Sequence, residues 1–359
     1  MSEPLSMEVR VESAAVESVR SGSATADPGG SFVELDFEAP RGLASPHLQS
    51  VLSSSAPRRL LVERQARVLR EASRSRILEC GDGIRLEARI SRHPAGGRRP
   101  VAIGLHGWHG CADSLYLLSS MTRLYRAGFD IVRLHLRDHG GTHGLNPELF
   151  HSCRLDEAVA ATGVVREMFP RRPLALLGFS LGGNFALRIG REAPAAGIDI
   201  DQVLAVCPVL DPAETMTALD SGWIGYRLYF MRRWRNSMLA KERSFPERYD
   251  FGATRTIRSL SGMTDWFVDH HTGFESTDHY LTGYTLTGRY LEGLEVPSAI
   301  VSALDDPVIP SAGLARLAAS PALEVAATRQ GGHCGFMSDY ALTSWMDEEV
   351  ARRLLPLAG

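Results

Sequence analysis

Short runs of consecutive apolar residues alternate, between residues 101 and 208, with longer segments in which apolar residues recur every three or four positions. Consecutive apolar residues are typical of strands buried on both faces of a parallel sheet, and the helical spacing is typical of amphipathic helices packed against it. The expected strands are 101–107, 129–136, 173–179 and 199–208, and the expected helices are 113–127, 155–169 and 181–192. The pattern therefore predicts an α/β fold with a mostly parallel central sheet and helices on both faces.

The chain before this region predicts a tail followed by a hairpin. Residues 1–32 are rich in Ser, Ala, Glu and Gly and lack the apolar segment of a secretory signal, so we expect a disordered N-terminal tail. Ordered structure is expected to begin near residue 33. Two apolar-rich segments, 77–80 and 84–90, flank Gly81-Asp82-Gly83, which is typical of a tight turn between antiparallel strands.

The alternation stops at residue 211 and resumes near residue 296. Residues 211–295 contain aromatic and arginine-rich helical fragments, and they follow the expected strand 199–208. Because ligands bind at the carboxyl ends of strands in open α/β sheets, we predict that this insertion forms a helical cap over that edge. The α/β core is then expected in two parts, 33–210 and 296–359. The last expected elements are strands 297–304 and 323–330 and helices near 312–319 and 341–354.

The segment Gly178-Phe179-Ser180-Leu181-Gly182 fits the pattern G-x-S-x-G. It follows an expected buried strand and opens an expected helix, which is the context in which a serine nucleophile is raised on a tight turn. The glycines are needed there because side chains two positions from the serine would collide with neighbouring elements. We predict that Ser180 is a nucleophile and that the Leu181 N–H is an oxyanion donor. A glycine-rich helix start with an N-cap serine is the alternative interpretation.

A serine nucleophile needs a base and an orienting acid, which in this context follow along the chain in the order acid, then histidine. Asp305 and Asp306 follow the expected strand 297–304, and His333 stands among glycines after the next strand. Both groups lie at strand carboxyl ends, where they can converge on Ser180. Asp306 is favoured over Asp305 because it precedes Pro307, although an ordinary Asp-Pro turn and a solvated histidine loop are the alternatives.

A second oxyanion donor is expected from the loop after strand 101–107. The backbone N–H of Trp108 is the candidate. His106 and His109 flank it, and we expect them to hold the loop by hydrogen bonds rather than to act as the base.

Composition excludes several other classes of protein. The net charge of −3 gives no basic surface for nucleic acid, and no stretch approaches the roughly 18 apolar residues of a membrane-spanning helix. The five cysteines are widely spaced without a C-x-x-C motif, which favours reduced thiols in the cytoplasm. His135, His139 and His143 recur every four residues but fall in an expected loop, so we expect no metal and no cofactor. Peripheral contact with membranes and the oligomeric state stay open.

Several motifs together resemble the serine α/β-hydrolase superfamily and, within it, the YheT-like branch of bacterial hydrolases, which is related to eukaryotic α/β-hydrolase-domain esterases and lipases. The segments that carry the resemblance span about residues 38–356 and are PHLQS (46–50), HGWHG (106–110), HSCRLDEA (151–158), GFSLGGN (178–184), DDP (305–307) and GGHCGF (331–336). The chain departs from the branch at two positions. Ser50 replaces the usual threonine, and Asp138 replaces the usual glycine after Arg137.

The resemblance and the motifs together imply a serine esterase that cleaves carboxylic esters of small or medium apolar acyl groups through an acyl-enzyme. A thioesterase or amidase would use the same residues, and a non-catalytic ligand-binding protein on a hydrolase fold is the alternative from another class. The expected partner is a small-molecule ester. Tyr229 and Phe230 in the cap are candidate substrate-binding residues, with packing inside the cap as the alternative.

Overall fold

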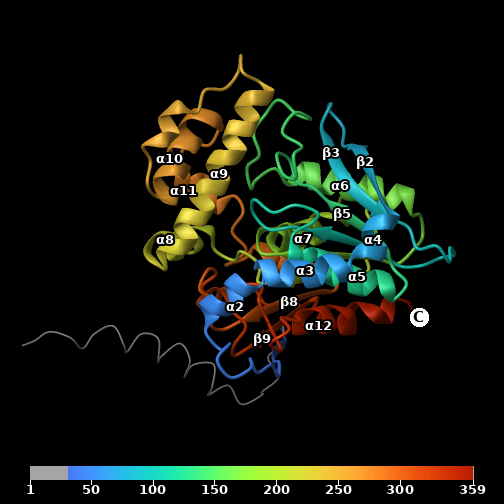
Figure 1. The fold of residues 1–359 in the computed structure, drawn as a ribbon. Helices are drawn as coiled ribbons and strands as arrows, with labels where there is room; N and C mark the ends of the chain where they lie inside the picture. Colours follow the sequence, from blue (N-terminus) through green and yellow to red (C-terminus); the bar gives the residue numbers. More distant parts are fainter. Residues whose placement is uncertain (1–30, 359) are drawn as a thin grey trace, which may run out of the picture.

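The computed structural model describes residues 31–358, and within them a nine-stranded sheet forms the centre of the molecule (Figure 1). Its strand order is β1-β9-β8-β7-β6-β4-β5-β3-β2. In the described residues, β2 with β3 and β3 with β5 are antiparallel, and the other paired strands are parallel. The strands are β1 (Ser31–Glu34), β2 (Ser73–Glu79), β3 (Arg85–Ser91), β4 (Val101–Leu105), β5 (Asp130–Leu134), β6 (Leu174–Phe179), β7 (Gln202–Val206), β8 (Ser298–Ala303) and β9 (Leu323–Thr328). The predicted mostly parallel α/β fold is confirmed.

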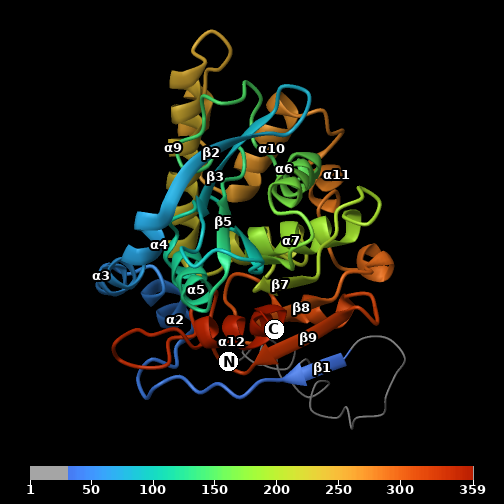
Figure 2. The ribbon, with the colours of Figure 1, turned by 90° about the vertical axis from the view of Figure 1, so that its right-hand side faces the viewer.

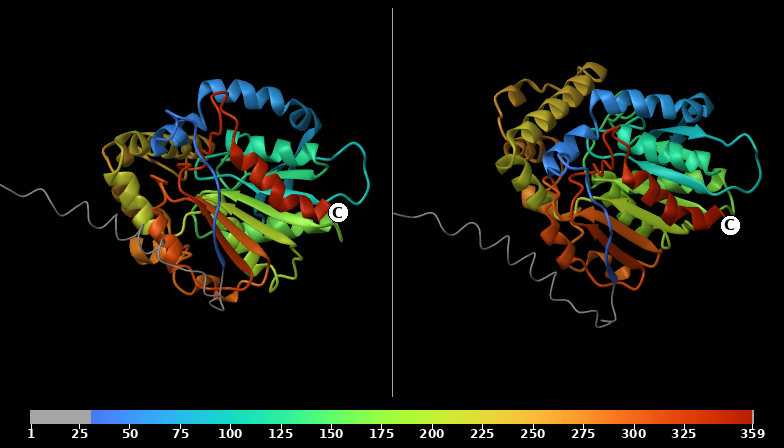
Figure 3. Two further views of the ribbon diagram at one scale, coloured as in Figure 1. Left: turned by 90° about the horizontal axis from the view of Figure 1, so that it is seen from below. Right: turned by 60° about the horizontal axis from the view of Figure 1, so that its bottom comes forward.

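Helices cover both faces of the sheet, which explains why the central strands are consecutive apolar residues. Every residue of β4, β5, β6 and β8 is buried. On one face, α5 (Leu115–Arg126) and α12 (Trp345–Leu354) lie side by side (Figures 2 and 3). On the other face are α6 (Leu155–Met168) and α7 (Leu181–Glu192). Successive residues of one strand enter different apolar clusters, so each face has its own core.

The expected hairpin is confirmed, with β2 and β3 paired antiparallel across a turn in which residues 81–83 all have positive φ. Residues 1–30 of the expected tail lie outside the described residues, and its last two residues begin β1, which pairs in parallel with β9. Three helices that the sequence analysis does not predict lie between β1 and β2. They are α2 (Pro46–Leu52), α3 (Ala56–Gln65) and α4 (Arg67–Ala72).

Two late helices differ from expectation. The helix expected near 312–319 is a 3₁₀ helix, η3 (Ser311–Arg316), and α12 begins at Trp345 rather than at 341. Pro310 directly precedes η3. A short loop that contains Leu342 at positive φ precedes α12, so this helix begins later than expected. None of the helices in residues 31–358 is both long and apolar enough to traverse a lipid bilayer.

The residues between β7 and β8 form four helices that stand to one side of the sheet, at the upper left of Figure 1. We call residues 211–295, the limits that the sequence predicts, the cap. Asp211 begins the first helix by accepting hydrogen bonds from the backbone of Ala213 and Glu214. The helices are α8 (Pro212–Ser221), α9 (Ile224–Ser244), α10 (Leu260–His271) and α11 (Thr277–Thr282), with short 3₁₀ helices η1 (Gly252–Arg255) and η2 (Tyr290–Gly293).

A buried ion pair joins the cap to the core. Lys241 of α9 is fully buried, and its ammonium group donates to Asp138 Oδ1, the Asn146 carbonyl and the Glu148 carbonyl, each at 2.7 Å. Asp138 Oδ2 accepts from the Phe150 N–H at 2.9 Å. A buried charge is costly unless its hydrogen bonds are satisfied, and here all three ammonium hydrogens have acceptors. The contact therefore fixes α9 against the loop that follows β5.

Candidate active site

Ser180 occupies a strained turn between β6 and α7. Its backbone φ is +54° and its ψ is −122°, a region that a residue with a side chain rarely adopts. The Ser180 N–H donates to the Val206 carbonyl at 2.9 Å, and the Ser180 carbonyl accepts from the N–H groups of Gly183 and Asn184. Ser180 stands at the N-cap position of α7, but its side chain makes no cap hydrogen bond. The hydroxyl is therefore free for another partner.

The two glycines of the motif are required by close backbone contact. A Cβ on Gly178 would lie 2.1 Å from the Gly182 carbonyl oxygen. A Cβ on Gly182 would lie 2.4 Å from the carbonyl oxygen of Leu105 and 2.6 Å from that of His106. All three distances are far below van der Waals contact, so α7 can begin this close to the end of β4 because these positions lack side chains.

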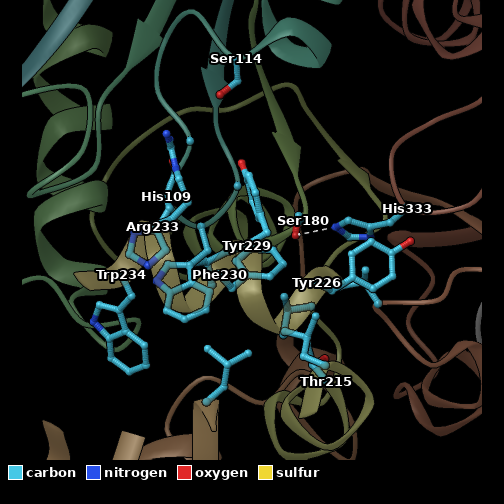
Figure 4. A pocket seen from close by; sticks show the side chains of 18 of the residues that line it. His109, Ser114, Ser180, Thr215, Tyr226, Tyr229, Phe230, Arg233, Trp234 and His333 are labelled. Carbon is cyan, nitrogen blue, oxygen red and sulfur yellow. Dashed lines mark hydrogen bonds between the residues drawn. The ribbon is translucent and has the colours of Figure 1, made fainter. Parts of the chain in front are cut away.

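The hydroxyl, an imidazole and a carboxylate form a continuous hydrogen-bonded series. His333 Nε2 lies 3.0 Å from Ser180 Oγ, and His333 Nδ1 lies 2.8 Å from Asp306 Oδ2 (Figure 4 for the first contact). The Asp306 side chain is 2% exposed, and its Oδ1 accepts from the N–H groups of Val308 and Ile309 at 2.8 and 2.9 Å. The structure thus brings together the three side chains that the sequence analysis names.

Asp305 holds the backbone next to the histidine instead of touching its ring. Its Oδ1 accepts from the Gly332 N–H at 2.9 Å, and burial raises the pKa of the Asp305 carboxyl. The two neighbouring carboxylates therefore have different contacts, with Asp306 at the imidazole and Asp305 at the loop backbone.

The first turns of α2 hold the same loop from the other side. The His333 N–H donates to Ser50 Oγ at 2.8 Å, and that hydroxyl donates in turn to the Pro46 carbonyl at 2.7 Å. The buried Gln49 side chain accepts from the Met337 N–H at 2.6 Å. Serine at position 50 supplies a hydroxyl, as the usual threonine of the resembled branch would. The sequence analysis quotes PHLQS without a role, because the contact joins residues nearly three hundred positions apart.

Asp306 also determines the charge preference of the imidazole. Burial by itself lowers the pKa of His333, but the adjacent Asp306 carboxylate, together with Cys334, outweighs it and raises the pKa well above the usual range. An imidazolium at this position is stabilised by its neighbour. When a neutral His333 ring takes up a proton, the neighbouring carboxylate therefore stabilises the charge that forms.

The loop after β4 packs against Ser180. A Cβ on Gly107 would lie 3.2 Å from Ser180 Cβ, and the Gly107 N–H donates to Tyr116 Oη at 3.0 Å. His106 Nδ1 lies 2.8 Å from the Gly107 carbonyl, and its Nε2 accepts from the Leu136 N–H at 3.3 Å. Burial lowers the pKa of His106 to about 3. The neutral His106 ring thus holds the loop.

The two predicted oxyanion donors lie beside the nucleophile. Leu181 follows Ser180 directly, and Trp108 follows Gly107 in the adjacent loop. Among the described residues, neither backbone N–H pairs with a backbone or side-chain acceptor outside regular secondary structure. Their role as donors to an oxygen that enters next to Ser180 stays a prediction.

A cavity of about 860 Å³ opens above Ser180 between core and cap, and His333 also lines it. In Figure 4, His333 and Tyr226 lie on one side of Ser180, and Trp234 lies on the other. The Phe230 ring stacks on Trp108, with centroids 5.5 Å apart and an interplanar angle of 15°. The lining is largely aromatic and aliphatic. Tyr229 and Phe230, the predicted substrate-binding residues, both border the cavity, and Tyr229 is 53% exposed.

His139 and His143 in the loop after β5 have hydrogen-bond partners of their own. His139 Nε2 accepts from the His109 N–H at 3.0 Å, and His143 Nε2 lies 2.9 Å from Ser237 Oγ. Within residues 31–358, one group of histidine, cysteine and carboxylate side chains has the spacing that could hold a metal ion. It consists of Cys207, His333 and Cys334, whose ligand atoms lie within 4.8 Å of one another. The sequence analysis expects no metal and misses this group, because Cys207 is distant in sequence from the other two.

Comparisons with known proteins place this geometry in a family context. The model described as "Alpha/beta hydrolase family" matches residues 102–344. The "Putative esterase YheT" of Escherichia coli (strain K12) is 23% identical over 324 residues, which cover 88% of this chain and 92% of that protein. The "Monoacylglycerol lipase ABHD2" of Danio rerio is 28% identical over 226 residues, covering 57% of this chain and about half, 53%, of that protein.

Solved structures share the fold at low identity. Est1E from Butyrivibrio proteoclasticus, with ferulic acid bound, has a TM-score of 0.51 and 17% identity, over 79% of this chain and 98% of that one. The Pyrobaculum calidifontis esterase has a TM-score of 0.55 and 18% identity, over 88% of this chain and 98% of that one.

The close approach of α7 to β4 gives a first prediction. Gly182→Ala should lower the free energy of unfolding by about 3 kcal/mol, because the added methyl group meets two backbone carbonyls that cannot move aside. Gly163→Ala in α6 is the matched control. Its Cβ would meet Ile198 Cδ1 at 3.5 Å, so it should be neutral or stabilise by about 0.5–1 kcal/mol. Denaturant unfolding measures both, and equal stability of the two variants would contradict the argument.

Proposed function

Because the chain belongs to the alpha/beta hydrolase family, in its YheT-like branch, we propose that Ser180, His333 and Asp306 cleave carboxylic esters through an acyl-enzyme. The protein is a carboxylic ester hydrolase of the kind that its relatives named esterase and monoacylglycerol lipase represent. The observation that carries the assignment of residues is the pair of contacts at His333. Its two ring nitrogens lie 3.0 Å from Ser180 Oγ and 2.8 Å from Asp306 Oδ2.

In the proposed first step, Ser180 Oγ attacks the ester carbonyl carbon while His333 Nε2 accepts the hydroxyl proton. Asp306 keeps the Nδ1–H tautomer and stabilises the imidazolium that forms. The tetrahedral intermediate carries its negative charge on the former carbonyl oxygen. The N–H groups of Leu181 and Trp108 are proposed to bind that oxygen, and each such donor contributes about 3–4 kcal/mol to barrier lowering.

In the second half, His333 donates its proton to the leaving alkoxide, and the alcohol departs. A water molecule then loses a proton to His333 and attacks the acyl-enzyme, and His333 returns that proton to Ser180 Oγ as the acid leaves. Asp305 and Ser50 contact the loop backbone at Gly332 and His333, so we assign them to holding the ring in position rather than to proton transfer.

For the substrate, we propose an ester with one apolar acyl chain of small or medium length. The cavity volume of about 860 Å³ lies in the range of small-molecule sites, and its aromatic and aliphatic lining suits a hydrocarbon chain. Thioester or amide cleavage is the alternative with the same residues. We further propose the cytoplasm as its location, since all five cysteines are free thiols, as is usual in a reducing compartment.

Ser180→Ala tests the proposal directly. The variant should keep its fold and lose both hydrolysis of p-nitrophenyl esters and labelling by a fluorophosphonate, because the attacking oxygen is gone. Wild-type labelling and circular dichroism of the variant serve as controls. Full labelling of Ser180→Ala would assign the nucleophile to another residue.

The two neighbouring carboxylates should differ in effect. Asp306→Asn should lower kcat by about 10⁴-fold, because an amide at this position favours the wrong imidazole tautomer. Asp305→Asn is the matched control, and it should cost much less, because this side chain contacts the Gly332 backbone and not the ring. Steady-state kinetics of both variants measure the difference, and the reverse ranking would make Asp305 the acid.

The cap aromatics should set acyl-chain preference. Tyr229→Ala and Phe230→Ala should change the ratios of kcat/KM across a series of p-nitrophenyl esters, since each buried methylene contributes about 0.8 kcal/mol. The rate of fluorophosphonate labelling should change little. Leu228→Ala is the control, because Leu228 is 61% exposed on the same helix. An unchanged chain-length profile with a lowered Tm would show that the two aromatics only pack within the cap.

A further inference from the structure

Two thiols lie beside the imidazole of His333 and take no part in the proposed hydrolysis. Cys334 follows His333 in the loop after β9, and Cys207 follows β7. The two Sγ atoms and one imidazole nitrogen all lie within 4.8 Å of one another. Cys207 is fully buried and Cys334 is 7% exposed. We call Cys207, His333 and Cys334 the thiol–imidazole cluster.

The backbone fixes both cysteines at these places. Cys207 has φ +44° and Cys334 has φ +54°, a conformation that costs energy for a residue with a side chain. The Cys207 N–H donates to the Val301 carbonyl at 2.9 Å, and Cys207 Sγ lies 4.0 Å from the Gly332 carbonyl oxygen. Strand β8 thus holds the Cys207 backbone, and both sulfur atoms lie next to the ring, where the three groups can share one ligand.

We propose that the thiol–imidazole cluster is an inhibitory binding site for a soft divalent cation such as Zn²⁺, held by two thiolates and one imidazole nitrogen. Zn²⁺ takes sulfur and nitrogen ligands in tetrahedral sites, and a set of two cysteines and one histidine leaves a fourth position open. Two thiolates neutralise the charge of the cation, which suits a buried place. The cation can enter from the cavity, which Cys334, His333 and Ser180 all line.

Binding there is incompatible with the proposed catalysis whichever ring nitrogen is used. Nδ1 of His333 is already paired with Asp306 Oδ2, and Nε2 with Ser180 Oγ. A cation on Nε2 removes the base from Ser180, and a cation on Nδ1 separates the ring from its orienting carboxylate. The inhibition part of this proposal rests on the proposed function, whereas the binding part does not.

Binding is tested first with Cd²⁺ as the probe, because thiolate–cadmium bonds give an ultraviolet charge-transfer band that reports the sulfur ligands without any enzyme assay. The full-length wild-type protein should bind one Cd²⁺ per chain with this band. Cys207→Ser and Cys334→Ser should each reduce the band and weaken binding at least about tenfold, since even partners outside the coordination shell contribute that much. Cys153→Ser is the control, because Cys153 Sγ faces the Tyr280 carbonyl outside the cluster.

Inhibition is tested by titrating Zn²⁺ into p-nitrophenyl ester hydrolysis and into fluorophosphonate labelling, with each variant compared with its own metal-free rate. Wild type and Cys153→Ser should be inhibited and should recover with EDTA. Both cluster variants should need at least about tenfold more Zn²⁺. Thermal unfolding confirms that each variant is folded. If Cys207→Ser does not fold, Cys334→Ser alone still tests the proposal.

Three results would overturn the proposal. They are no charge-transfer band with wild type, equal Zn²⁺ inhibition of wild type and both cluster variants, or Cd²⁺ binding through the thiols without inhibition by Zn²⁺. If the wild-type protein neither hydrolyses esters nor reacts with the fluorophosphonate, the proposed function fails, and the Cd²⁺ titration still decides whether the site exists.

Discussion

The backbone conformation at Ser180 is the constraint on which the site depends. Holding a serine at φ +54° costs about 1–3 kcal/mol, and hydrogen bonds from its own N–H and to its carbonyl oppose that cost. The turn works only because Gly178 and Gly182 let α7 start against the end of β4. The same close approach places the loop at Gly107 beside the hydroxyl. One local geometry thus brings Ser180, the start of α7 and the loop at Gly107 together at the same point.

The histidine reaches this turn through sheet topology and through contacts with distant segments. β8 and β9 are parallel neighbours, so their carboxyl ends deliver Asp306 and His333 to the same edge. Ser50 of α2 then fixes the loop by accepting from the His333 N–H. The strands β8 and β9 and the helix α2 therefore together determine where the His333 imidazole lies.

The difference between local patterns and contacts of distant segments explains what could be predicted from the sequence. The buried parallel strands and the turn at Ser180 are local patterns of apolar residues and glycines, and the structure has them where those patterns indicate. β1 is four residues long and exists through its pairing with β9, and α2 to α4 have no strong apolar periodicity, so local patterns gave no signal for them. The neighbourhood of Cys207, Cys334 and His333 and the contact of Ser50 with His333 arise from tertiary contacts between distant residues. No window of the sequence contains them.

The aspartate at position 138 has its charged partner in the cap. Its φ of +57° is a conformation that glycine adopts easily, and the aspartate carboxylate there meets the ammonium group of Lys241. Lys241 is also the single lysine of the sequence, and it is completely buried. A lysine-specific endoproteinase consequently has one target bond in this chain, located inside the contact between cap and core. Its cleavage rate at native conditions measures how often α9 unfolds around Lys241 and releases this side chain from the loop after β5.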